Sequence, residues 1–141
     1  MSRILSKLQE LVFDKIDGDA TLKTLLGGNG KVKYAGPQNY AEYPCVTYQV
    51  LVEADNPYEA DQAGSNIVNS RLIIQSFVND ISPLNVTKLD DRVFAILNGQ
   101  PLTDVNVKVF TCYRQSRSEQ YDKDVKCWVS TSSYNIVNVN V

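Results

Sequence analysis

Two pairs of neighbouring carboxylates are the first candidates for chemistry in this sequence. Asp90 and Asp91 are adjacent, and Asp122 and Asp124 lie two residues apart in a charged segment. Paired carboxylates work together as acid and base only when they converge across a cleft. Successive helical side chains diverge by about 100°, so we expect Asp90 and Asp91 to lie on a solvated helix face. We expect Asp122 and Asp124 to be exposed and neutralised by neighbouring lysines.

The sequence contains no histidine, which narrows the possible chemistry further. Ser-His-Asp and Cys-His triads, histidine metal sites and histidine acid–base catalysis are excluded. The three cysteines, Cys45, Cys112 and Cys127, are an odd number without a C-x-x-C pair. This pattern argues against a disulfide framework and against a structural zinc site. We therefore expect buried, reduced thiols, no catalytic residue, no metal site and no cofactor.

Other binding motifs are also missing. The glycine cluster at 27–30 lacks the Gly-Lys-Ser/Thr ending of a phosphate-binding loop, so it predicts a turn. The formal net charge of −2 provides no basic field for a nucleic-acid backbone. No apolar run approaches the roughly 20 residues needed to cross a bilayer. The first residues lack the apolar core of a signal peptide, so we expect a cytoplasmic start.

A strand followed by a helix forms the centre of the predicted fold. The segment Ile67–Val78 is rich in β-branched residues and lacks Gly and Pro. Its middle is apolar on both sides, with Leu72 and Ile74 on one and Ile73 on the other, as in a central strand. Ser82-Pro83 predicts a helix start and Asn98-Gly99 a helix end, with an apolar stripe between them.

The remaining segments complete a single α+β domain over residues 1–141. We predict an amphipathic helix at 2–16, two short turns at 20–26, and strands at 31–35, 45–52, 104–114 and 125–141, the last with a bulge near 131–133. The order α-β-β-β-α-β-β indicates a mostly antiparallel sheet packed against two main helices, with long hairpin loops. The predicted core contains Leu8, Val12, Ile73, Leu89, Val93 and Val107.

Two long connections are the candidate contact surfaces. The segment Glu53–Asn66 is acidic and has no basic residue, and Arg114–Lys126 is a second hairpin tip of mixed charge. The eight tyrosines, several of them beside these loops, are typical of protein interfaces. The alternatives are solvated loops without a role and ordinary aromatic residues at strand edges.

Several segments together resemble the tail-terminator, or tail-completion, proteins of long-tailed bacteriophages. An amphipathic helix leads to Tyr43-Pro44-Cys45-Val46-Thr47-Tyr48, and Arg71-Leu-Ile-Ile-Gln75 lies in the next strand. A polar turn and a helix ending at Leu97 follow, and the closing hairpin has Tyr121-Asp122 at its tip and a Tyr134-Asn-Ile136 ending. The resemblance covers nearly the whole chain.

The resemblance implies a non-enzymatic virion protein that forms a homohexameric ring. Such a ring caps the tail tube, stops its growth and joins the tail to the head connector. The implied partners are further copies of the chain, the tail-tube protein and the head–tail connector protein, without a membrane. DNA would pass through the ring without sequence-specific contacts. The implied location is the virion tail or neck, after assembly in the host cytoplasm.

The residues that we expect at the contacts are Glu53, Asp55, Tyr58, Glu59, Asp61, Arg114, Arg117 and Tyr121. Two other functions stay open at this point. One is another neck or tail-tube subunit, and the other is a small-ligand-binding or enzymatic α+β domain. Ring formation would separate an assembly subunit from a ligand-binding domain. Growth into open tubes would indicate a tube protein.

Overall fold

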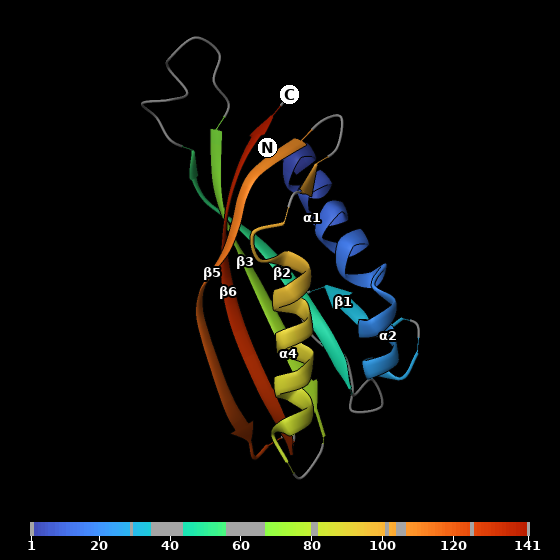
Figure 1. The fold of residues 1–141 in the computed structure, drawn as a ribbon. Helices are drawn as coiled ribbons and strands as arrows, with labels where there is room; N and C mark the ends of the chain where they lie inside the picture. Colours follow the sequence, from blue (N-terminus) through green and yellow to red (C-terminus); the bar gives the residue numbers. More distant parts are fainter. Residues whose placement is uncertain are drawn as a thin grey trace.

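The chain folds into one layer of twisted strands with helices packed on one face (Figure 1). The computed structural model describes residues 2–28, 30–34, 44–55, 67–79, 82–100, 102–103, 107–124 and 126–140. The helices are α1 (Ser2–Asp17), α2 (Ala20–Leu26) and α4 (Leu84–Leu97). The strands are β1 (Val32–Tyr34), β2 (Cys45–Asp55), β3 (Ile67–Val78), β4 (Leu102–Thr103), β5 (Val107–Asp122) and β6 (Cys127–Asn140). The predicted α+β class is confirmed.

The six strands lie in the order β1-β2-β3-β6-β5-β4. Only the pairing of β1 with β2 is parallel among the described strands, so the sheet is mostly antiparallel, as predicted. β3 pairs with β2 on one side and with β6 on the other. β3 is therefore a central strand, with Leu72 and Ile74 buried on one face and Ile73 half-buried on the other.

The core lies between the helices and one face of the sheet. Leu72 and Ile74 of β3 are fully buried there, beneath the apolar stripe of α4. α1 packs against β1 and β2, and α4 packs against β3 and β6. Of the predicted core residues, Leu8, Val12, Leu89 and Val93 are buried.

Ile73 and Val107 are the other two predicted core residues. Ile73 is only half-buried, because it points to the face of β3 opposite the buried Leu72 and Ile74. Its prediction as a core residue between helices and sheet was therefore wrong. The side chain of Val107 lies outside the described residues.

The predicted helix boundaries of α4 agree with the structure. The Ser82 hydroxyl accepts a hydrogen bond from the Leu84 N–H at 3.2 Å, although Pro83 occupies the capping position. At the other end Gly99 adopts a φ of 72°, which favours glycine. The Gly99 N–H donates to the Cys112 carbonyl at 2.7 Å. The end of α4 is thereby attached to β5.

The largest departure from the predicted elements concerns β5. The segment Arg114–Lys126 was predicted as a loop, but β5 continues as strand to Asp122, and of the described residues only Lys123, Asp124 and Lys126 lie between β5 and β6. β2 likewise extends past the predicted end at Val52 to Asp55. The outer half of β5 is polar on both faces, so it lacks the apolar alternation from which strands are predicted.

Candidate functional site

A bulge in β5 brings two arginines to the same face of the sheet. Strand residues three positions apart normally point to opposite faces. The register of β5 against β6 shifts between Arg114 and Ser116, which leaves Gln115 as an extra residue. Arg114 and Arg117 consequently both face α4. The bulge predicted at 131–133 of β6 was thus assigned to the wrong strand, since the pairing of β6 with β3 is continuous there.

Asp90 of α4 forms ion pairs with both arginines. Its side chain is fully buried. One oxygen accepts from the Ser132 hydroxyl at 2.6 Å, and the other lies 3.1 Å from Arg114 Nη1 and 2.9 Å from Arg117 Nε. A buried carboxylate requires such charged partners, because desolvation otherwise makes its ionised form very unfavourable. The expectation that Asp90 is solvated was therefore wrong, whereas the Asp91 side chain is 65% exposed.

Further carboxylates surround Arg117. Its guanidinium also contacts Asp91 at 3.5 Å and donates to Glu119. Glu119 in turn accepts from the Thr87 hydroxyl at 2.9 Å. Burial lowers the pKa of Arg117, but the charges of Asp90, Glu119 and Asp91 more than offset it, so the pKa lies above its ordinary value. Arg117 therefore remains a cation within the protein.

Arg114 is held equally firmly. Its guanidinium carbon lies 4.1 Å from the centre of the Phe94 ring, a cation–π contact. Its backbone N–H donates to Asn98 Oδ1 at 2.8 Å. The Tyr134 hydroxyl lies in the same buried region, and burial together with the charge of Asp90 raises the pKa of this phenol. The cluster of Asp90, Arg114, Arg117 and Ser132 joins α4 to β5 and β6, and its Ser132 hydroxyl, which donates to Asp90, is fully buried.

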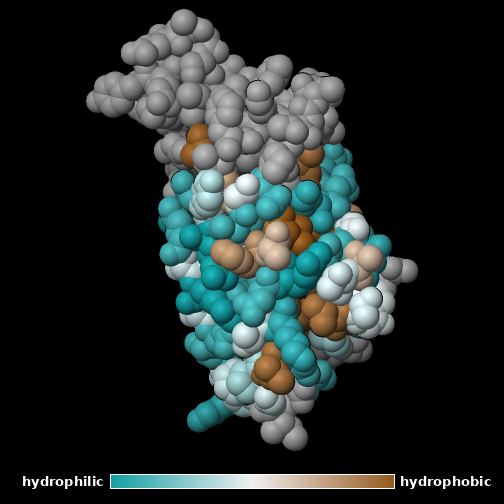
Figure 2. All heavy atoms as spheres, in the orientation of Figure 1, coloured by the Kyte–Doolittle hydropathy of each residue, from teal (hydrophilic) through white to brown (hydrophobic). Residues whose placement is uncertain are grey.

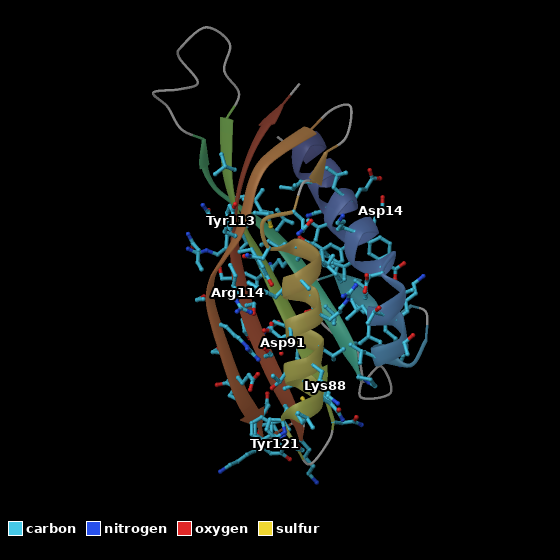
Figure 3. The ribbon with its side chains drawn as sticks, viewed as in Figure 1. Asp14, Lys88, Asp91, Tyr113, Arg114 and Tyr121 are labelled. Carbon is cyan, nitrogen blue, oxygen red and sulfur yellow. The ribbon has the colours of Figure 1, made fainter. Side chains whose placement is uncertain are left out.

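Among the predicted contact residues whose side chains the structure describes, Tyr121 and Arg117 are exposed and Arg114 is half-buried. Tyr121 is 44% exposed near the end of β5 (Figure 3). Its ring meets Trp128 edge to face, with centroids 5.5 Å apart. The side chains of Arg114 and Arg117 are 23% and 28% exposed, and both pair with Asp90. The structure therefore brings these two arginines together at Asp90, whereas Tyr121 packs on Trp128.

The acidic candidates lie mostly outside the described residues. The backbones of Glu53 and Asp55 belong to the end of β2, but their side chains are not described. Tyr58, Glu59 and Asp61 lie wholly outside the described residues. Their assignment as contacts stays a prediction.

The described residues hold no cluster suited to a metal ion. No group of three or more His, Cys, Asp or Glu side chains gathers among them. Cys45, Cys112 and Cys127 are buried and form no disulfide with one another, and burial raises the pKa of Cys112 to about 12. Such a thiol is a poor nucleophile. None of the described helices has the length and apolarity to cross a membrane.

Two pockets lie beside α4. An open one of about 410 Å³ is lined partly by Asp19, which caps α2 through the Leu22 N–H at 2.9 Å. Arg92 also lines this pocket, and two of its nitrogens donate to the Asp19 carboxylate at 2.7 and 2.8 Å. Asp19 and Arg92 thus neutralise each other in a pocket that Asp14 and Lys15 also line. A second pocket, of about 160 Å³, is lined by Leu25, Pro44, Val78, Asn85, Lys88 and Leu89.

The role of Asp90 was missed at the level of sequence, although a signal was present. Asp90 follows Val86 by four residues and precedes Val93 by three and Leu97 by seven, so it lies on the apolar stripe of α4. A charged residue on such a stripe requires a buried partner. The partner could not be inferred from the sequence, because the bulge at Gln115 decides which arginines face the helix.

Comparisons with known proteins find a shared fold. No protein-family model and no curated protein sequence matches the chain. A solved structure described as the virion of a native gene transfer agent particle contains a chain with a similar fold. The similarity has a TM-score of 0.77 and 16% sequence identity, and it covers 95% of each chain. At this identity the likeness establishes the fold alone.

Proposed function

We propose that this chain is a structural virion protein that caps the end of a phage tail tube as a closed ring. The ring ends tail growth and joins the tail to the head connector. The observation that carries the proposal is the similarity to a chain of a gene transfer agent virion, which extends over 95% of both chains. The sequence resemblance to tail-terminator proteins supports the more specific role.

The side chains are consistent with an assembly subunit. The polar cluster around Asp90 is fully used in holding α4 to the sheet. Several large apolar side chains are nevertheless exposed, among them Leu84 at 57%, Tyr113 at 53% and Tyr121 at 44%. Exposed aromatic and aliphatic residues supply much of the binding energy of protein interfaces. Such residues favour a protein partner over a small-molecule substrate.

In the proposed ring the acidic segment Glu53–Asn66 is part of the contact surface, and Tyr121 contributes from the other hairpin. A closed ring needs a heterologous interface, in which one patch meets a different patch on the next copy. Arg114 and Arg117 do not contact the next copy in this proposal, because both guanidinium groups are paired with Asp90. They fix the position of β5, which carries Tyr121.

The test is to measure assembly and tail capping together. The purified protein, alone and with tail-tube ends, is examined by absolute mass measurement and by negative-stain imaging. We expect rings of uniform mass, and we expect tails made without the protein to be overlong or unjoined to heads. Open tubes of this protein would indicate a tail-tube subunit instead. A monomer that neither forms rings nor binds tube ends would overturn the proposal.

A further inference from the structure

The pocket of about 160 Å³ has the size and lining of a site for one side chain. It lies between α2, the first half of α4 and the end of β3, and Leu25, Val78 and Leu89 supply apolar walls. Cavities of about 150 Å³ accommodate a benzene ring. Lys88 is exposed and is the one charged residue among the described residues that line the pocket. The pocket therefore suits an aromatic ring that has a carboxylate nearby.

The surface around the pocket contains exposed apolar side chains. Leu25 is 40% exposed on one side, and Leu84 is 57% exposed in the first turn of α4. Figure 2 shows hydrophobic surface over the lower part of α4 and between α4 and α2, within a mainly hydrophilic surround. Figure 3 places Lys88 on the same half of α4. Exposed apolar surface with a polar rim is typical of protein contacts.

A segment of matching chemistry occurs in the chain itself. Residues 53–61 contain four carboxylates and no cation, and Tyr58 is their one aromatic residue. Glu59 follows Tyr58 directly. A tyrosine beside a carboxylate has the features that the pocket and Lys88 would bind.

The segment cannot reach the pocket of its own chain. In the antiparallel pair of β2 and β3, Cys45 lies opposite Phe77, beside the pocket residues Pro44 and Val78. Asp55 lies opposite Val68 at the far end. The ten steps from Cys45 to Asp55 span about 33 Å of strand, whereas Tyr58 extends at most about 11 Å beyond Asp55. Any occupation of the pocket by Tyr58 must therefore come from a second copy.

We infer that Tyr58 of one copy enters the pocket between α2 and α4 of the next copy, with Glu59 facing Lys88. The inference rests on the proposed assembly into a ring and names its subunit contact. Opposite ends of the sheet meet in this contact, so it is heterologous and continues from copy to copy until the ring closes. The aromatic ring of Tyr58 supplies most of the affinity of the contact. The pairing of Glu59 with Lys88 sets its register.

The contact can be tested by disulfide crosslinking between two variants. Lys88→Cys and Glu59→Cys are made in separate, differently tagged chains and oxidised after mixing. We expect a mixed covalent dimer and little product from either variant alone. A chain with both substitutions should give covalent oligomers and no internal bridge. The natural cysteines do not interfere, because all three are buried.

Two further variants make the test specific. Adding Tyr58→Ala to the Glu59→Cys chain should reduce the crosslink about tenfold or more, as expected for loss of an aromatic anchor. Lys15→Cys is the matched control, since Lys15 is an exposed lysine of α1 outside the pocket, and it should give no specific product. Circular dichroism spectra are compared first, so that an unfolded variant is recognised.

The outcomes separate this inference from the proposed function. If the parent protein caps tails but the mixed dimer does not form, the pocket contact is wrong and the capping role stands. If the mixed dimer forms but tails made without the protein are normal, the contact stands and the capping role is wrong. An internal bridge in the double variant, or equal crosslinking after Tyr58→Ala, would also overturn the inference.

Discussion

At the scale of single residues, we expect the buried carboxylate of Asp90 to contribute strongly to stability. It is fully buried, and removing its charge leaves Arg114 and Arg117 without their shared partner. Breaking a buried ion pair costs about 3–5 kcal/mol, and both arginines are partly exposed. We expect Asp90→Asn to lower the free energy of unfolding by about 2–4 kcal/mol, measured by urea denaturation.

Asp91 supplies the matched control for this prediction. It is the next residue on the same helix, and its side chain is 65% exposed. Asp91→Asn should change the unfolding free energy by less than about 0.5 kcal/mol. Equal effects of the two substitutions would show that the cluster around Asp90 does not hold α4.

Asp19 gives a prediction of pH dependence. The hydrogen bonds from Arg92 lower the pKa of Asp19; burial opposes this shift, and the Leu22 N–H adds to it. A lowered folded pKa contributes stability above the unfolded value, near 3.8, and the contribution is lost as pH falls through the folded pKa. Asp19→Asn should therefore flatten the acid side of the stability curve. If Arg92→Met has the same effect and the double variant adds nothing, the pair is the cause.

At this scale, an interaction could be predicted from the sequence only when the two interacting residues are close together in the chain. The caps at Ser82 and Gly99 act within a few residues, so they could be predicted. The pairing of Asp90 with Arg117 depends on an unpredictable bulge. The pocket beside Lys88 depends on how three separate elements meet, and no local pattern encodes that.

At the scale of elements, the packing of α4 on the sheet predicts a sharp contrast between two leucines. Leu89 is 2% exposed and faces the core, whereas Leu84 is 57% exposed in the same helix. Leu89→Ala should cost about 2–4 kcal/mol through lost burial and a cavity. Leu84→Ala should cost less than about 0.5 kcal/mol. Thermal or urea unfolding of both variants measures the difference, and equal losses would contradict the observed orientation of α4.

The elements that could be predicted are those whose start and end residues and apolar pattern are clear in the sequence. β3 lacks breakers and is apolar on both faces, and α4 has a clear start, stripe and end. The outer half of β5 was missed because polar residues suit both of its faces, one toward the ion cluster and one toward solvent. The apolar phase shift along β6 was not a sign of a bulge, because β6 pairs continuously with β3. A bulge in β5 leaves the alternation of β6 unchanged, so the sequence of β6 could not reveal it.

At the scale of the whole molecule, the acidic segment should be dispensable for folding but needed for assembly. β2 and β3 pair as far as Asp55 opposite Val68, so deletion of residues 56–64 with a short glycine bridge should leave the core intact. We expect a melting temperature close to that of the parent protein. Ring formation and tail capping should be weakened, as seen by mass measurement and imaging.

A variant with the same deletion that caps tails and joins heads like the parent would place the contact surface elsewhere. A variant that does not fold would show that the segment also stabilises the sheet. Circular dichroism spectra distinguish this case from a loss of assembly alone.

The position of β6 has a consequence for the protein during synthesis on the ribosome. β6 follows every other described strand in the chain, yet it lies between β3 and β5 in the sheet. Until it emerges, the strongly apolar β3 has an open edge, and β5 has no neighbour except the two-residue β4. An unpaired apolar edge promotes aggregation. Nascent chains that stall before Cys127 should therefore need chaperones, whereas full-length chains close the sheet in one late step.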